Sequence, residues 1–236
     1  MLRGETRHAS FDDNAQLFGT GTKVDYFPAD TPNRGVSEKL YQIQLKLQGL
    51  PDAEGGYLWL PSDSDENRRK YISSNRELIN AASRDSGIPP EMLAGIAWQE
   101  VEGDPTWLDS LAFRVRRFHP SLGDANETSV GPLAIQVRRA AEVLGYDPTD
   151  LSDEEQMEVY EAARNPKTNM FISAEYLAQL KAESPYADVP PDKMTREQMQ
   201  DLAARYNGGP YFDSPDAQAY GRGFDNIVDQ AQGALK

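Results

Sequence analysis

The amino-acid sequence predicts a mainly α-helical domain over residues 71–236, preceded by an N-terminal extension over residues 1–70 that contains a short β-hairpin. From residue 71 onward, apolar residues recur at helical spacing and are bounded by capping residues, glycines and prolines. Residues 1–36 are instead rich in Gly, Pro, Asp, Asn and Thr without a sustained period, which is typical of loops. A length of 236 residues suits one domain with a sizeable appendage, or two small domains.

The predicted hairpin lies between residues 36 and 61. Residues 36–50 fit two patterns: Tyr41, Ile43, Leu45 and Leu47 alternate as in a half-buried strand, whereas Val36, Leu40, Ile43, Leu47 and Leu50 follow a helical stripe. The apolar run YLWLP at 57–61 would supply a partner strand, and this favours the hairpin. Residues 62–70 (SDSDENRRK) are expected to form a charged connector.

The helices of the main domain are predicted from their start and stop signals. Ser74 with Glu77, Ser152 with Glu155, and Thr195 with Gln198 have the spacing of capping boxes. Helix starts are expected at Pro90, Asp104-Pro105, Asn165-Pro166 and Ser214-Pro215. Stops are expected at Gly87, Gly103 and Gly145, the last one closing a helix over VRRAAEVL, while residues 119–129 and Gly131-Pro132 are expected to form a loop and a turn.

Composition excludes several classes of function. The formal charge of −14 argues against a nucleic-acid binder and against a polybasic membrane-surface protein. There is no cysteine, so disulfides, thiolate catalysis and Cys-ligated zinc are excluded. The sequence contains no run of about 18 apolar residues, so no membrane-spanning segment is predicted. The N-terminal residues do not resemble a Sec signal peptide. No metal or cofactor is expected, since the two histidines belong to no ligand motif and residues 63–67 fail as a calcium loop.

Glu100 is the first candidate catalytic residue. The helix that starts at Pro90 is expected to bury a stripe of residues at positions 93, 96, 97, 100 and 101, so Glu100 occupies an apolar position near the helix end. Desolvation and the negative end of the helix dipole both disfavour its charged form and should raise its pKa. A raised pKa suits a general acid, whereas the alternative role is a structural carboxylate paired inside the fold.

Two further segments supply candidate binding residues. In the helix over 196–206, Met199, Leu202, Ala203 and Tyr206 share one face, so Tyr206 points inward just before the stop at Asn207-Gly208-Gly209-Pro210. In TSVGPLAIQV (128–137), a turn at Gly131 carries Ser129 and Gln136 next to an apolar strip, which would suit the lining of a cleft. Each segment taken alone also fits ordinary helix termination or a plain loop.

Taken in order, these segments resemble the lysozyme-like lytic transglycosylases, the superfamily of soluble lytic transglycosylases and goose-type lysozymes. The similarity joins Glu100 and Pro105, the Ser129-Val130-Gly131 segment with its downstream Gln, the stretch NPKTNMFISAEYLAQL, and the ARYNGG segment, and it spans residues 75–212. In that family a helix ends in a catalytic Glu, a Ser-x-Gly…Gln segment lines the glycan cleft, and a Tyr lies beside the Glu. The resemblance therefore implies an α+β lysozyme-like fold.

The resemblance implies cleavage of the β-1,4 bond between N-acetylmuramic acid and N-acetylglucosamine, with Glu100 as the single general acid/base. Ser129, Gly131, Gln136, Tyr206 and Asn207 are the implied substrate-binding residues. A lytic transglycosylase needs no second carboxylate, whereas a hydrolytic muramidase needs one on the opposite face of the sugar. Since Glu102 should face away from Glu100 on the helix and Asp104 should cap the next helix, the transglycosylase outcome is favoured.

The chain departs from the family pattern at three positions. Val101 follows Glu100 where the family has Ser, Gly103 replaces a common aromatic residue, and the family Gln corresponds either to Gln136 or to Ala134. If it corresponds to Ala134, a substrate contact is missing. The alternatives to an enzyme are a non-catalytic peptidoglycan-binding or effector module on the same scaffold, or a helical structural protein without glycan binding.

The basic clusters at 114–117 (RVRR) and Arg138-Arg139 are expected to be solvated helix faces; alternatively, they hold acidic peptide stems or muramoyl carboxylates. The expected partner is the peptidoglycan glycan strand, with residues 1–70 as a segment for a delivery or immunity partner. The protein is expected to act at the cell wall, in the periplasm or outside the cell. Without a Sec signal it would arrive by another export route, on a virion, or after removal of a leader.

Overall fold

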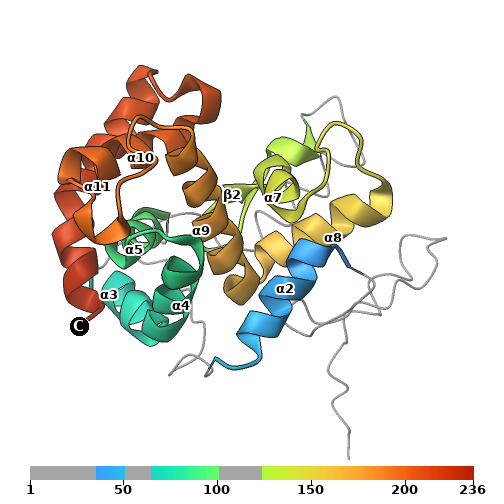
Figure 1. Cartoon of the computed structure of the whole chain (residues 1–236), viewed down its shortest axis with the longest axis horizontal. Coiled ribbons are helices and arrows are strands. Elements are labelled where there is room, and N and C mark those ends of the chain that lie inside the picture. The colour runs from blue at the N-terminus through green and yellow to red at the C-terminus, as the bar shows by residue number, and fades with distance from the viewer. Residues whose placement is uncertain (1–35, 51–64, 101–123) are drawn as a thin grey trace, which may run out of the picture.

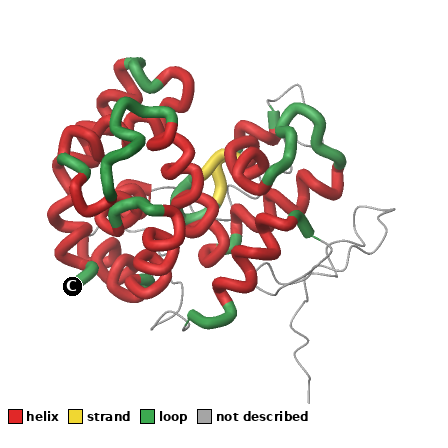
Figure 2. The backbone as a smooth tube through the Cα atoms, in the orientation of Figure 1, coloured by secondary structure: helices red, strands yellow, loops and turns green. Residues whose placement is uncertain are grey.

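The computed structural model describes residues 36–50, 65–100 and 124–236, and these residues form a mainly α-helical fold (Figures 1 and 2). The helices are α2 (Glu38–Leu47), α3 (Asp65–Ser74), α4 (Arg76–Ser86), α5 (Pro90–Glu100), α7 (Val137–Leu144), α8 (Asp153–Arg164), α9 (Pro166–Ala182), α10 (Arg196–Gly208) and α11 (Pro215–Ala234). Short 3-10 turns lie at Ala125–Glu127, Pro191–Lys193 and Gly209–Tyr211. Within the described ranges, the mainly helical fold class predicted from the sequence is confirmed.

The predicted N-terminal hairpin is wrong for residues 38–47, which form helix α2. The helical stripe of Leu40, Ile43 and Leu47 is buried, and α2 packs against α9 and α7. Burial of this stripe outweighs the strand-like alternation, because the alternating Tyr41 and Leu45 stay partly exposed. The proposed partner strand at 57–61 lies outside the described residues.

The charged segment before residue 71 also differs from its prediction. Residues 65–70 are not a connector but the first part of α3, which packs against α11 and α5. Helices α2 and α3 thus contact the helices of the main domain, although both begin before residue 71. The role of residues 1–70 and the domain boundary at residue 70 stay predictions.

Most predicted helix boundaries are confirmed. The capping boxes at Ser152 and Thr195 are present, and Asn165 and Ser214 cap α9 and α11 ahead of their N-terminal prolines. The box predicted at Ser74 is wrong, because Ser74 is the last residue of α3 and Asn75 is the N-cap of α4, which begins at Arg76. The starts and stops predicted at residues 103–105 lie outside the described residues.

The two strands flank the predicted Gly131-Pro132 turn. Strand β1 (Ser129–Val130) pairs antiparallel with β2 (Ile135–Gln136), and Ser129 lies opposite Gln136. Gly131 has a φ of 76° and Ala134 a φ of 46°, so both ends of the turn use the left-handed region. The buried side chain of Asn169 on α9 fixes the turn: its amide nitrogen donates to the carbonyls of Val130 and Ala163, and its oxygen accepts from the Leu133 N–H.

Helix α9 lies in the middle of the fold (Figure 1), and α5 packs among α3, α4, α10 and α11. Residues 92–98 of α5 are all buried, so this part of the helix has no solvated face. The prediction of a single buried stripe on α5 is therefore wrong for these residues. Helix α9 contacts α2, α4, α5, α7, α8 and α10. No helix in the described ranges is both long and apolar enough to cross a membrane.

Helix α11 packs closely against α5 at Gly95. A Cβ atom at Gly95 would lie 2.3 Å from Cε2 of Phe224, so only glycine permits this approach. Phe224, Val228 and Ala231 are buried as predicted for α11, while Tyr220 and Ile227 are partly buried against the core. The close contact brings Tyr220, one helical turn before Phe224, to the last turn of α5.

Candidate functional site

A cleft of about 330 Å³ lies where five parts of the fold meet. These are the end of α5, the β1–β2 hairpin, the first turn of α7, the middle of α9, and the end of α10 with the turn that follows it. Its described lining comprises Glu100, Ser129, Ala134, Ile135, Gln136, Arg138, Arg139, Tyr176, Tyr206, Asn207, Gly208, Gly209 and Tyr211. The lining is thus assembled from segments that are up to 111 residues apart in sequence (100 to 211).

Glu100 is half-buried and is the last described residue of α5. Desolvation raises the pKa of its carboxyl group above the ordinary value, and the hydrogen bond from Tyr220 partly offsets this by favouring the carboxylate. The predicted direction of the shift is therefore confirmed, with burial as its main cause. Among the described residues that line the cleft, Glu100 is the only acid.

Tyr220 on α11 is the hydrogen-bond partner of Glu100. Its hydroxyl donates to Oε1 of Glu100 at 2.6 Å, and the Gln99 amide donates to its backbone carbonyl at 3.2 Å. Burial and the nearby carboxylate raise the pKa of Tyr220 well above its ordinary value, so the hydroxyl keeps its proton. The sequence placed Tyr220 on the buried face of this helix but gave no sign of its contact with Glu100.

Tyr206 lines the cleft but does not hydrogen-bond to Glu100. Its hydroxyl donates to the Leu133 carbonyl at 2.7 Å and also makes a 3.2 Å hydrogen bond with the Ser173 hydroxyl. The ring lies tilted against that of Tyr176, with 5.5 Å between the centroids. Tyr206 is therefore buried as predicted, yet its hydroxyl joins α10 to the hairpin turn and to α9.

The other predicted binding residues separate into two groups. Ser129, Gln136 and Asn207 line the cleft together with Glu100 and Tyr206. Gly131 is not among the lining residues: its Cα faces α8 and α9, where an added Cβ would lie 2.4 Å from the Asn169 amide nitrogen. Both Gln136 and Ala134 reach the cleft, so either position is placed to contact a ligand.

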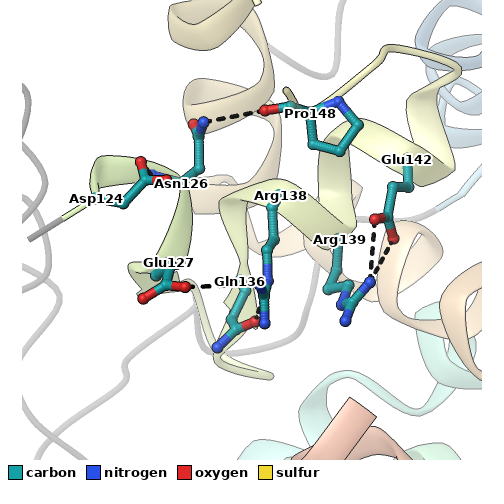
Figure 3. Close-up of polar contacts among 8 residues, drawn as sticks. All are labelled: Asp124, Asn126, Glu127, Gln136, Arg138, Arg139, Glu142 and Pro148. Atoms are coloured by element: carbon teal, nitrogen blue, oxygen red, sulfur yellow. Dashed lines mark hydrogen bonds and ion pairs between the residues drawn. The ribbon is translucent and has the colours of Figure 1, made fainter. Parts of the chain in front are cut away.

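Arg138 and Arg139 line the cleft as well, and Figure 3 shows Arg138 beside Gln136 and Arg139 paired with Glu142. Arg139 donates to both carboxylate oxygens of Glu142, and its guanidinium lies 5.9 Å from the ring centroid of Tyr176. With only 17% of its side chain exposed, Arg139 does not belong to a solvated helix face, so that prediction is wrong for this residue. The cluster at 114–117 lies outside the described residues.

Tyr211 and Tyr176 also line the cleft, although the sequence did not single out either of them. Tyr211 is the more exposed of the two. It is 76% exposed and ends the 3-10 turn that follows α10. The sequence shows an aromatic residue directly after the Asn-Gly-Gly-Pro segment. Its exposure and its position at the cleft depend on how α10 ends.

No three His, Cys, Asp or Glu side chains in the described part of the chain lie close enough together to hold a metal ion. Comparison of the chain with models of known families, with curated proteins and with solved structures finds no match.

Proposed function

We propose that the protein cleaves peptidoglycan glycan strands as a lytic transglycosylase, with Glu100 as the single general acid/base. The observation that carries this proposal is a half-buried carboxyl group with a raised pKa that lines a polar cleft without a second acid among its described residues. A group of this kind is neutral at a higher pH than an ordinary Glu and can donate a proton. The cell wall is the corresponding place of action.

In the first step, Glu100 gives its proton to the glycosidic oxygen while the bond from that oxygen to C1 of the muramoyl residue breaks. The resulting carboxylate then accepts the proton of the muramoyl 6-hydroxyl as O6 bonds to C1. This closes a 1,6-anhydro ring and restores neutral Glu100. The nucleophile is a hydroxyl group of the substrate, which is why one carboxyl group suffices.

The hydrogen bond from Tyr220 favours one of the two carboxyl oxygens of Glu100 for this proton transfer. Because Oε1 accepts the Tyr220 hydrogen bond, the acidic proton of neutral Glu100 belongs on Oε2. The described residues give the carboxyl group no second hydrogen bond that would compete for that proton. Ser129, Gln136 and Asn207 supply hydrogen-bonding groups along the cleft for sugar hydroxyl and acetamido groups.

The test is mass spectrometry of the products released from purified cell-wall sacculi. The wild-type protein should release 1,6-anhydro muropeptides, and Glu100→Gln should abolish their release. Glu91→Gln is the matched control, since Glu91 lies in the first turn of the same helix and does not line the cleft. Full activity of Glu100→Gln would overturn the assignment. Reducing-end products would indicate a hydrolytic muramidase, and sacculus binding without products would indicate a non-catalytic module.

A further inference from the structure

The first turn of α7 carries two consecutive arginines that both line the cleft, in a chain with a net charge of −14. Figure 3 shows Arg138 and Arg139 projecting in the same direction from this helix. The N-terminal end of a helix carries a partial positive charge, so cations in the first turn are disfavoured and acids are preferred there. Their position therefore opposes helix stability, which favours a role in binding an anion over a structural one.

The existing contacts hold Arg139 in place and leave Arg138 more readily available to a ligand. Arg139 holds Glu142 through Nη1, while its Nη2 would lie only 3.0 Å from a Cβ atom at Gly209. Arg138 donates from Nε to Gln136 at 3.0 Å, and its Nη1 lies 3.6 Å from Glu127, whose side chain is 59% exposed. An exposed ion pair such as Arg138–Glu127 contributes little to stability, so a ligand carboxylate can replace Glu127 at small cost.

An exposed aromatic ring lies at the same end of the cleft. Tyr211 belongs to the 3-10 turn Gly209–Tyr211, and the first residue of that turn is the one that approaches Arg139. At 76% exposure its ring is open to solvent although it lines the cleft. A flat, apolar ring in this place can pack against the C–H face of a pyranose ring.

We propose that this end of the cleft binds a sugar residue that carries a carboxylate, with Tyr211 against the sugar ring and Arg138 and Arg139 on the carboxylate. The inference rests on the proposed function and names the residues that would select a carboxylate-bearing glycan strand over an uncharged N-acetylglucosamine polymer. The carboxylate has two sources, the lactyl group of a muramoyl residue without peptide, or the stem peptide where one is attached. Guanidinium groups suit both, because they bind carboxylates through paired N–H donors.

Binding measurements with Glu100→Gln, which keeps the arginines and Tyr211, test the inference. Isothermal titration would compare three ligands: chitopentaose, a muramoyl tetrasaccharide with free lactyl carboxylates, and the same tetrasaccharide with stem peptides. At least one carboxylate-bearing ligand should bind about tenfold or more tightly than chitopentaose, and the tighter of the two identifies the source. Adding Arg138→Gln and Arg139→Gln should remove the preference for carboxylate-bearing ligands. Adding Tyr211→Ala should weaken the binding of all three ligands.

The control is the double change Arg76→Gln and Arg84→Gln on α4, which alters the net charge equally at residues that do not line the cleft. It should preserve the preference. Arg138→Gln alone, at the more exposed arginine, keeps the test valid if the double variant does not fold. Equal binding of all three ligands, absence of binding, or a preference that survives loss of both arginines would overturn the inference. A different result would show that the proposed function fails: wild-type protein that releases no anhydro muropeptides from sacculi.

Discussion

At the scale of single residues, the hydrogen bond from Tyr220 to Glu100 controls both the orientation and the acidity of the proposed catalytic carboxyl group. Burial raises the pKa of Glu100, and the Tyr220 hydroxyl lowers it again by stabilising the carboxylate. Tyr220 stays protonated, so the hydrogen bond persists in both protonation states of Glu100. The balance of these two effects sets the pH range in which Glu100 can act as an acid.

Tyr220→Phe should therefore change the pH dependence of activity as well as the rate. Without the hydroxyl, the pKa of Glu100 rises further. The acid form then persists to higher pH, and the alkaline limb of kcat should move upward. Loss of the positioning hydrogen bond should lower kcat by about tenfold. The measurement is a pH–rate profile with a soluble glycan substrate.

Tyr206→Phe is the matched control for that prediction. Its hydroxyl bonds to Leu133 and Ser173, so the change should reduce stability by about 1–3 kcal/mol without moving the alkaline limb. The role of Tyr220 in setting the pKa of Glu100 would be refuted if the alkaline limb of kcat stayed unchanged in Tyr220→Phe, or if it moved equally in both variants.

The sequence identifies some residues of the site but not their partners. Glu100 and Tyr206 stand out because each is a polar residue at an apolar position of a helix, which is a local pattern. The contact of Tyr220 with Glu100 depends on how α11 crosses α5, and the position of Arg139 over Tyr176 depends on how α7 packs against α9. Contacts between helices far apart in sequence have no local signature.

At the scale of elements, the contact between α5 and α11 depends on the absence of a side chain at Gly95. Gly95→Ala should destabilise the protein by about 1–3 kcal/mol, because its Cβ would overlap the ring of Phe224. In an unhindered helix the same change would stabilise by up to about 1 kcal/mol, so the sign of the effect tests the contact. Urea denaturation measures it.

Gly233→Ala provides the control for this element, since nothing lies within 4 Å of a Cβ there and the residue belongs to the last turn of α11. It should be neutral or stabilising. The additional change Phe224→Leu should recover part of the stability lost in Gly95→Ala. A stabilising effect of Gly95→Ala alone would contradict the close packing of the two helices.

Element boundaries were predictable where capping chemistry decides them and unpredictable where packing decides. The hydroxyl and carboxamide caps at Ser152, Asn165, Thr195 and Ser214 act within a few residues, and each is present in the fold. Residues 38–47 fit two periods equally well, and only burial against α9 selects the helix. Strand pairing of Ser129 with Gln136 likewise depends on Asn169, which is more than 30 residues away.

At the scale of the whole molecule, the raised pKa of Glu100 links stability to pH. A folded-state pKa above the unfolded value means that the folded protein binds the proton more tightly, so this contribution is complete below the ordinary Glu range and is lost as pH rises. Glu100→Gln removes the buried charge and should raise Tm by a few degrees at neutral pH. The difference should shrink in acid, and calorimetry across pH measures it. A pH-independent difference would contradict the linkage.

Under the proposed function, the net charge of −14 makes the long-range interaction with the polyanionic cell wall repulsive. Raising the ionic strength from about 0.01 M to about 0.1 M shortens the Debye length from about 30 Å to about 10 Å. Binding of Glu100→Gln to intact sacculi should therefore increase over this range, and a co-sedimentation assay measures it. A monotonic loss of binding with salt would show that long-range attraction dominates instead.

The hydrogen bonds of Tyr206 separate the shape of the cleft from its proposed chemistry. The Tyr206 hydroxyl joins α10 to the hairpin turn and to α9 without contacting Glu100. Under the proposed function, a variant that exchanges Glu100 for a neutral residue therefore keeps these bonds and the cleft that they hold. The ARYNGG segment accordingly indicates the shape of the cleft, and the residue at position 100 decides whether the bound glycan can be cleaved.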